Sequence, residues 1–155
     1  MASTVKAATG KVTIMVEHPS LGGAVKFVQT IPSVVELDHR TMEIGSSTEI
    51  EVIGFLATNP GSGTFDEADV RFILLINRDD TNFIQLIFKN ASSDECAHKL
   101  EKGSFMVLSV SDEGVMTIHD ADSSAISSVT FADLVNITAL ANSGACDLEY
   151  VVMGV

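Results

Sequence analysis

The chain has 155 residues, 46% of them hydrophobic and 19% charged, a balance that indicates a folded globular protein and excludes wholesale disorder. Its net charge of −12 argues against nucleic acid as a partner, because nucleic-acid affinity depends on Lys and Arg contacts to phosphate, and equally against anionic membrane surfaces. The N-terminus lacks the apolar segment of a secretory signal, and the longest apolar run, residues 72–76, is too short to span a membrane. We therefore expect synthesis in the cytoplasm.

The first eleven residues differ in character from the rest of the chain. Residues 2–11 are small and polar and show no periodicity, which is typical of a segment that is either disordered or ordered only against a partner. The sequence therefore predicts an extended N-terminal arm over residues 1–11 and one domain over residues 12–155.

Short strands are expected from residue 12 onward, separated by turn residues. The turn HPSLGG follows the first strand, and Pro32, which cannot donate to a β ladder, separates the second strand from the third. In the fourth strand Glu49 and Glu51 alternate with Ile50 and Val52, the period of two of a half-exposed strand. The predicted ranges of these strands are 12–17, 25–30, 34–37 and 48–53.

The middle of the chain, residues 69–90, reads DVRFILLINRDDTNFIQLIFKN. In its first half, residues 70–76, apolar side chains occur on both faces of the expected strand. This pattern indicates a central strand that is covered on both sides. The polar cluster NRDDTN then favours a hairpin turn into a strand over residues 83–88. Residues 91–102 are polar and fit either a short helical turn or a loop.

Two further strands, over residues 104–110 and 115–118, follow turns that contain glycine. Residues 131–140 fit a short amphipathic helix and a strand equally well, and a last strand closes the chain. Short strands with turn signals about every ten residues predict an all-β, single-domain fold, a β-sandwich or a jelly-roll-like fold, with at most one short helix.

No local pattern indicates catalysis, a cofactor or a metal. The histidines are not paired at ligand spacings, and Cys96 and Cys146 are too few and too far apart for a disulfide framework or a zinc knuckle. Cys146 falls in the last strand and is expected to face inward. The acidic residues of segment 119–124 lack the spacing of an EF-hand, and we interpret them as solvated loop acids. The four histidines are His18, His39, His98 and His119.

A resemblance adds to these patterns. The strand and turn of residues 70–84, the Gly-led strand of residues 99–105 (KLEKGSF) and the Ala-rich ending of residues 139–152 (ALANSGACDLEYVV) resemble small β proteins of tailed-bacteriophage virions. The resemblance implies a non-enzymatic structural role in the virion. It favours a capsid decoration (cement) protein that bridges neighbouring subunits of the shell.

The implied partners are the major capsid protein or another virion protein, and further copies of the chain in a homo-oligomer, with a trimer favoured. A tail, neck or fibre-attachment subunit is the alternative position in the particle. A glycan-binding module is a more distant alternative, because the chain has no Trp and its only Tyr is Tyr150. The residues expected to contact partners lie in the N-terminal arm and in the loop of residues 59–65. They are Ala2, Ser3, Thr4, Val5, Lys6, Lys11, Asn59, Pro60, Thr64 and Phe65.

Overall fold

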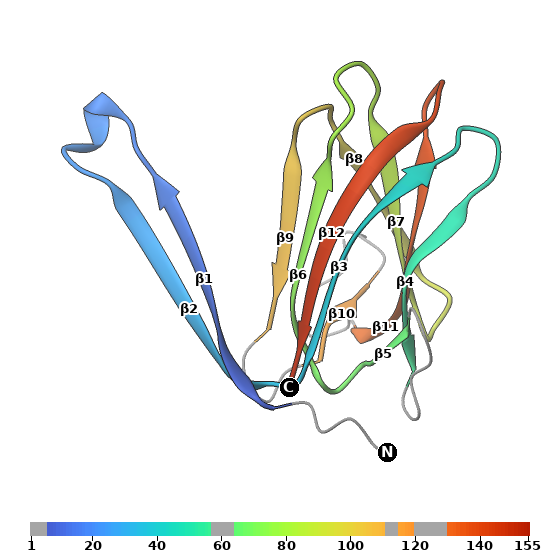
Figure 1. Cartoon of the computed structure of the whole chain (residues 1–155). Helices are drawn as coiled ribbons and strands as arrows, with labels where there is room; N and C mark the ends of the chain where they lie inside the picture. Colours follow the sequence, from blue (N-terminus) through green and yellow to red (C-terminus); the bar gives the residue numbers. More distant parts are fainter. Residues whose placement is uncertain (1–5, 57–63, 111–114, 120–129) are drawn as a thin grey trace.

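The computed structural model describes residues 6–56, 64–110, 115–119 and 130–155. Within these ranges the chain forms strands joined by turns, and the one helical segment is the 3₁₀ turn η1 (Pro19–Leu21). The prediction of an all-β fold is confirmed. The strands form two sheets that face each other and a separate two-stranded hairpin that projects away from them (Figure 1).

The larger sheet is six-stranded and has the order β5-β4-β11-β7-β8, with β10 also paired to β11. All of these pairs are antiparallel except β4 and β5, which run parallel. Its strands are β4 (Ile50–Leu56), β5 (Thr64–Asp66), β7 (Ile84–Asn90), β8 (Glu95–Leu100), β10 (Thr117–Ile118) and β11 (Ala132–Ala141).

The smaller sheet is four-stranded and antiparallel, with the order β3-β12-β6-β9. One apolar core lies between the two sheets, and both contribute fully buried side chains to it, such as Leu75 and Leu148 from the smaller sheet and Leu86 and Ile137 from the larger. We call these two sheets together the body. The strands of the smaller sheet are β3 (Glu36–Ile44), β6 (Val70–Asn77), β9 (Phe105–Ser109) and β12 (Cys146–Gly154).

The N-terminal hairpin is the part of the structure that the sequence predicted least well. Strand β1 (Ala8–Val16) begins before the expected position and includes residues 8–11, which were assigned to an extended arm. It pairs with β2 (Val25–Val34), and the two strands pair with no other strand among the described residues. We call β1, η1 and β2 together the hairpin.

Pro32 does not end a strand, contrary to expectation. It lies within β2, where the pairing with β1 is irregular: Ile31 pairs with Gly10 and Val34 with Ala8. Ser33 adopts a left-handed φ of 58° at the same place. This irregularity leaves the missing N–H of Pro32 outside the ladder, which is how a strand tolerates proline.

The predicted hairpin of residues 69–90 is also wrong, although both of its strands exist. Strand β6 belongs to the four-stranded sheet and β7 to the six-stranded sheet, so the turn NRDDTN carries the chain from one sheet to the other. The side chain of Asn77 stabilises this turn between the two sheets. Its Nδ2 donates to the carbonyls of Asn82 (2.9 Å) and Leu100 (3.2 Å), and its Oδ1 accepts from the Asp79 N–H (3.0 Å).

Two ambiguous segments prove to be strands. Residues 131–140 fall mostly in β11, which lies between β4 and β7 in the larger sheet. Its ladders are irregular between Leu134 and Asn136 and between Ile137 and Thr138, which shifts the apolar positions out of strict alternation and explains the helix-like spacing. Residues 91–102, expected as a helical turn or loop, contain β8 at the sheet edge.

The hairpin contacts the body along the half of its length nearer the base, up to Gln29, whose Nε2 donates to the Val110 carbonyl at 3.3 Å. Ile31 and Val34 of β2 pack on Phe72 of β6, and these three side chains form an apolar cluster separate from the main core. Gly10 of β1 allows this approach, because a Cβ there would lie 3.0 Å from Met153 Sδ and 3.1 Å from Val34 Cγ2. The hairpin is therefore attached at one end and extends freely beyond it.

Replacing Ile31 with alanine is expected to loosen the hairpin without unfolding the body. Ile31 is 1% exposed and provides much of the attachment. Truncating a buried Ile costs about 2–5 kcal/mol, and here this loss lowers the free energy needed to open the hairpin locally from the body. Hydrogen exchange should therefore accelerate in β1 and β2 and stay unchanged in β7 and β11. Val28→Ala, on the same hairpin at 42% exposed, is the matched control and should change neither.

Candidate interaction surface

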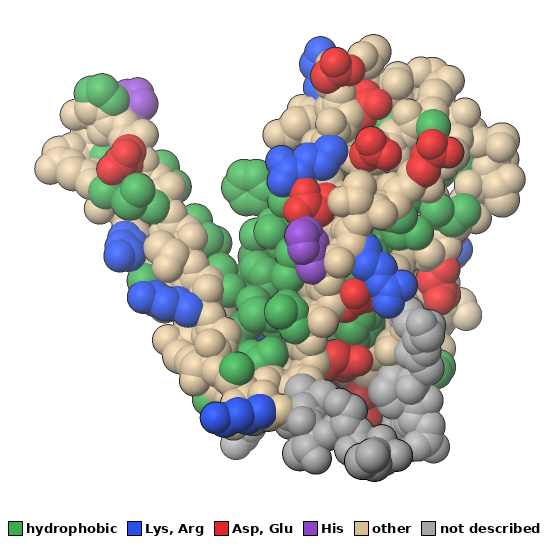
Figure 2. Space-filling view, in the orientation of Figure 1, with side chains coloured by type: hydrophobic (Ala, Val, Ile, Leu, Met, Phe, Trp, Pro, Cys, Tyr) green, Lys and Arg blue, Asp and Glu red, His purple; other side chains and the backbone are tan. Residues whose placement is uncertain are grey.

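A groove lies between the hairpin and the body in the described part of the chain. It has a volume of about 460 Å³, and residues of β1 form one wall while residues of β6 and β9 form the other. The lining residues are mostly apolar, and Arg78 is the one charged residue among them. Figure 2 shows hydrophobic side chains facing the space between the two parts.

The hairpin wall follows from the alternation of β1 and β2. Val12 pairs with Gln29, Ile14 with Phe27, and Val16 with Val25, so these side chains share one face of the ribbon. The same face carries Ile31, which is buried against the body, and therefore it is the face turned toward the groove. The opposite face is mixed and includes two lysines. The opposite-face residues in the paired region are Lys11, Thr13, Met15, Lys26, Val28 and Thr30.

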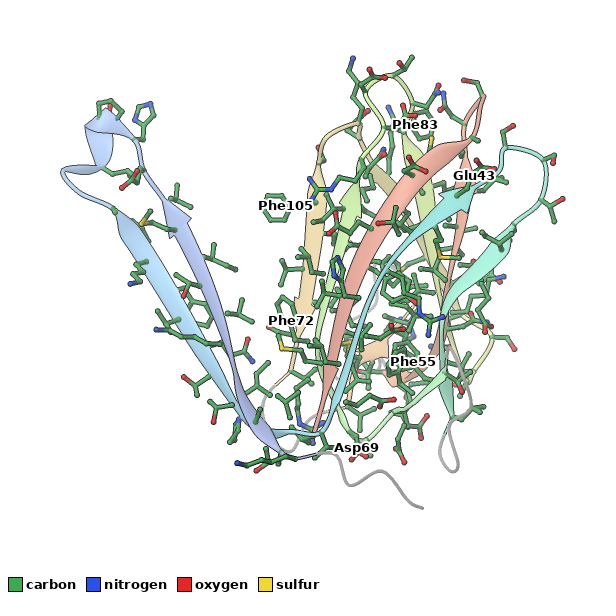
Figure 3. All side chains as sticks on the ribbon, in the orientation of Figure 1. Glu43, Phe55, Asp69, Phe72, Phe83 and Phe105 are labelled. Carbon is green, nitrogen blue, oxygen red and sulfur yellow. The ribbon has the colours of Figure 1, made fainter. Side chains whose placement is uncertain are left out.

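The body wall is the outer face of the four-stranded sheet. Ile76 of β6 pairs with Phe105 of β9, and Leu74 pairs with Val107, so all four side chains share this face. The ring of Phe105 extends from the edge strand toward the hairpin and is 64% exposed (Figure 3). The prediction that the strand of residues 70–76 is covered on both sides is confirmed near the base, where the hairpin buries Phe72. Toward the far end of β6 the outer face is open.

Ion pairs border the groove at one side. Arg78 Nε donates to Glu149 Oε2 at 2.5 Å, and His39 Nε2 lies 2.8 Å from Glu149 Oε1. The hydrogen bonds from Arg78 and then from His39 lower the pKa of the Glu149 carboxyl. These charges are therefore satisfied within the chain, and the apolar walls dominate what the groove can bind.

Acidic residues crowd the base of the body, where the hairpin joins it. Burial raises the pKa of Glu36, and repulsion from Asp69, Asp38 and Asp66 raises it further. Because the folded state favours the protonated form, the Glu36 carboxylate opposes folding once the pH rises above the usual value near 4.5.

Glu36→Gln is accordingly expected to stabilise the protein at pH 7. The gain should shrink as the pH falls toward and below 4.5, because wild-type Glu36 then takes up its own proton. Urea unfolding of both proteins from pH 4 to pH 8 measures this difference. Glu43→Gln, which removes one exposed charge from the same strand, is the control, and an equal gain there would show that net charge alone is responsible.

The predicted contact residues are found in different environments. Lys6 and Lys11 are exposed, Thr64 is half-buried in β5, and Phe65 is buried in the core at 3% exposure. Phe65 is therefore unavailable to a partner, a correction to the prediction that follows from the pairing of β5 with β4. The remaining predicted contacts lie outside the described residues; they are Ala2, Ser3, Thr4, Val5, Asn59 and Pro60.

Neither wall of the groove was predicted from the sequence. The alternation of Val12, Ile14 and Val16 was available as a signal for a strand with one apolar face. Nothing local indicated that this face would stand away from the body, because that depends on contacts between Ile31 and Phe72, which are distant in sequence.

The described residues contain no group of three His, Cys, Asp or Glu side chains that could hold a metal ion. Cys146 is buried, as expected, and burial raises the pKa of its thiol. Tyr150 is also buried, at 2% exposure, and provides no platform for a sugar ring. The acidic segment of residues 119–124 lies almost entirely outside the described residues.

Comparison of the chain with protein-family models, with curated protein sequences and with solved structures finds no match. Within the described ranges, no helix has the length and apolar character needed to cross a membrane.

Proposed function

We propose that this chain is a non-enzymatic structural component of a tailed-phage virion, and specifically a capsid decoration (cement) protein. The observation that carries the proposal is the projecting hairpin, whose apolar face lies open beside an equally apolar sheet face. Apolar surfaces of this kind mark sites of protein–protein interaction. The resemblance of residues 69–155 to small virion proteins supplies the biological context.

A decoration protein stabilises a shell by adding buried interface between neighbouring subunits. A rigid β body with a hairpin attached at one end suits this role, because the body keeps its shape while the hairpin reaches an adjacent molecule. The acidic composition of the chain supports the same role, since a high net charge keeps a protein soluble until it assembles.

Quantitative mass spectrometry of purified particles tests the position in the virion. A shell protein is expected in very many copies per particle, in a fixed ratio to the major capsid protein. A count of only a few copies per particle would instead support the tail, neck or fibre-attachment alternative. Absence of the chain from purified particles would refute a virion role altogether.

A further inference from the structure

The apolar face of the hairpin and the outer face of the four-stranded sheet meet at the base of the hairpin. Beyond the base they separate, and neither face covers the other. On the hairpin, Val25 and Phe27 are 59% and 57% exposed, and on the body Phe105 is 64% exposed. Near the base the same two faces touch and bury Ile31 and Phe72 almost completely. The far half of each face therefore presents to solvent the kind of surface that the near half buries.

The far half of the hairpin has little to stabilise it. A two-stranded ribbon without a covering layer is at most marginally stable in water, and the body contacts this one only on the half nearer the base. Burying apolar area stabilises by about 25 cal/mol per Å² removed from water. A second layer on the open faces would supply that missing stabilisation.

The charge distribution indicates what this layer is. The hairpin, residues 8–34, contains two lysines and one glutamate, a net charge of +1, whereas residues 36–155 contain six Lys or Arg and twenty Asp or Glu, a net charge of −14. The body of one copy therefore repels the body of another copy, while the hairpin of one copy is attracted to the body of another. The hairpin is thus both the apolar and the cationic part of an otherwise acidic chain.

We propose that the groove receives the hairpin of a second copy of this chain. The incoming hairpin sets its apolar face, with Phe27 at its centre, against the outer face of β6 and β9 around Phe105. Its lysines, on the opposite face, then lie within the field of the acidic body. Reciprocal exchange gives a two-fold dimer and head-to-tail exchange gives a closed ring, and both use this one contact.

The proposal does not depend on the virion role, because it concerns the purified chain alone. Light scattering coupled to size exclusion should show an oligomer for the wild type. Phe27→Asp should reduce it to a monomer whose body is unchanged by circular dichroism. The matched control is Val28→Asp, one residue along the same strand on the opposite face and 42% exposed, and it should remain oligomeric.

A mixing experiment separates exchange from misfolding. Phe105→Asp should also be monomeric, because it damages the groove while keeping the hairpin intact. Mixed with Phe27→Asp, which keeps the β6–β9 wall of the groove intact, it should form hetero-oligomers, since one undamaged hairpin then meets one undamaged body wall. A monomeric wild type at high concentration, equal disruption by Val28→Asp, or no association on mixing would each overturn the proposal.

Discussion

Asn77→Ala is expected to destabilise the protein by about 3 kcal/mol or more, although it removes no apolar contact. The Asn77 side chain is fully buried and satisfies three backbone groups, the carbonyls of Asn82 and Leu100 and the N–H of Asp79. Alanine leaves all three without this partner, and each unsatisfied buried group costs about 1–3 kcal/mol. The free energy of unfolding in urea measures the loss.

Asn142→Ala is the control for this prediction, because Asn142 is an exposed asparagine in the turn between β11 and β12. Its replacement should change the free energy of unfolding by about 0.5 kcal/mol or less. Similar losses from the two variants would show that the turn between the sheets does not depend on the Asn77 amide.

Leu75→Ala is expected to lower the free energy of unfolding by about 3 kcal/mol, within the usual range for truncating a buried leucine. Leu75 lies at the centre of β6, is 0% exposed and belongs to the core shared by both sheets. For a chain of this length the melting temperature should fall by roughly 6–12 °C. Thermal unfolding followed by circular dichroism measures the change.

The matched variant is Leu56→Ala at the end of β4, where the side chain is 46% exposed. It should cost about 1 kcal/mol or less, because little area returns to water and no cavity forms. If both leucines cost the same, the difference in burial between the two positions would not govern the stability of this core.

Alternation along the sequence was sufficient to predict which side chains are buried in parts of several strands. Val52 is buried and Glu51 is exposed in β4, and Cys146 and Tyr150 face inward from β12. These outcomes depend on neighbouring residues alone, because successive side chains of a strand point to opposite faces.

Which strands pair could not be predicted in the same way. The turn between β6 and β7 has the composition of a hairpin turn, but β6 pairs with β12 and β9, while β7 pairs with β11 and β8. A strand followed by a polar turn looks the same whether the next strand returns to its own sheet or crosses to another. The choice depends on partners far along the chain, and that information is absent from the local pattern.

The candidate site was beyond prediction for a related reason. The predicted contacts were selected as loops and termini, and one of them, Phe65, is a core residue of β5. The groove instead consists mostly of regular strands, and its exposed residues, such as Ile14 and Phe105, resemble core residues in sequence. Whether an apolar residue is buried or exposed depends on the three-dimensional arrangement of the strands.

The short joint between the hairpin and the body has a mechanical consequence. A single residue, Val35, separates β2 from β3, and its N–H donates to the Gly154 carbonyl at 3.1 Å. Tension on the hairpin therefore enters the body at the first of the nine residue pairs that join β3 to β12. A pull directed along β3 loads these pairs in shear, so that their hydrogen bonds must break together instead of opening one by one. The hairpin is thus anchored as a tether that resists extraction.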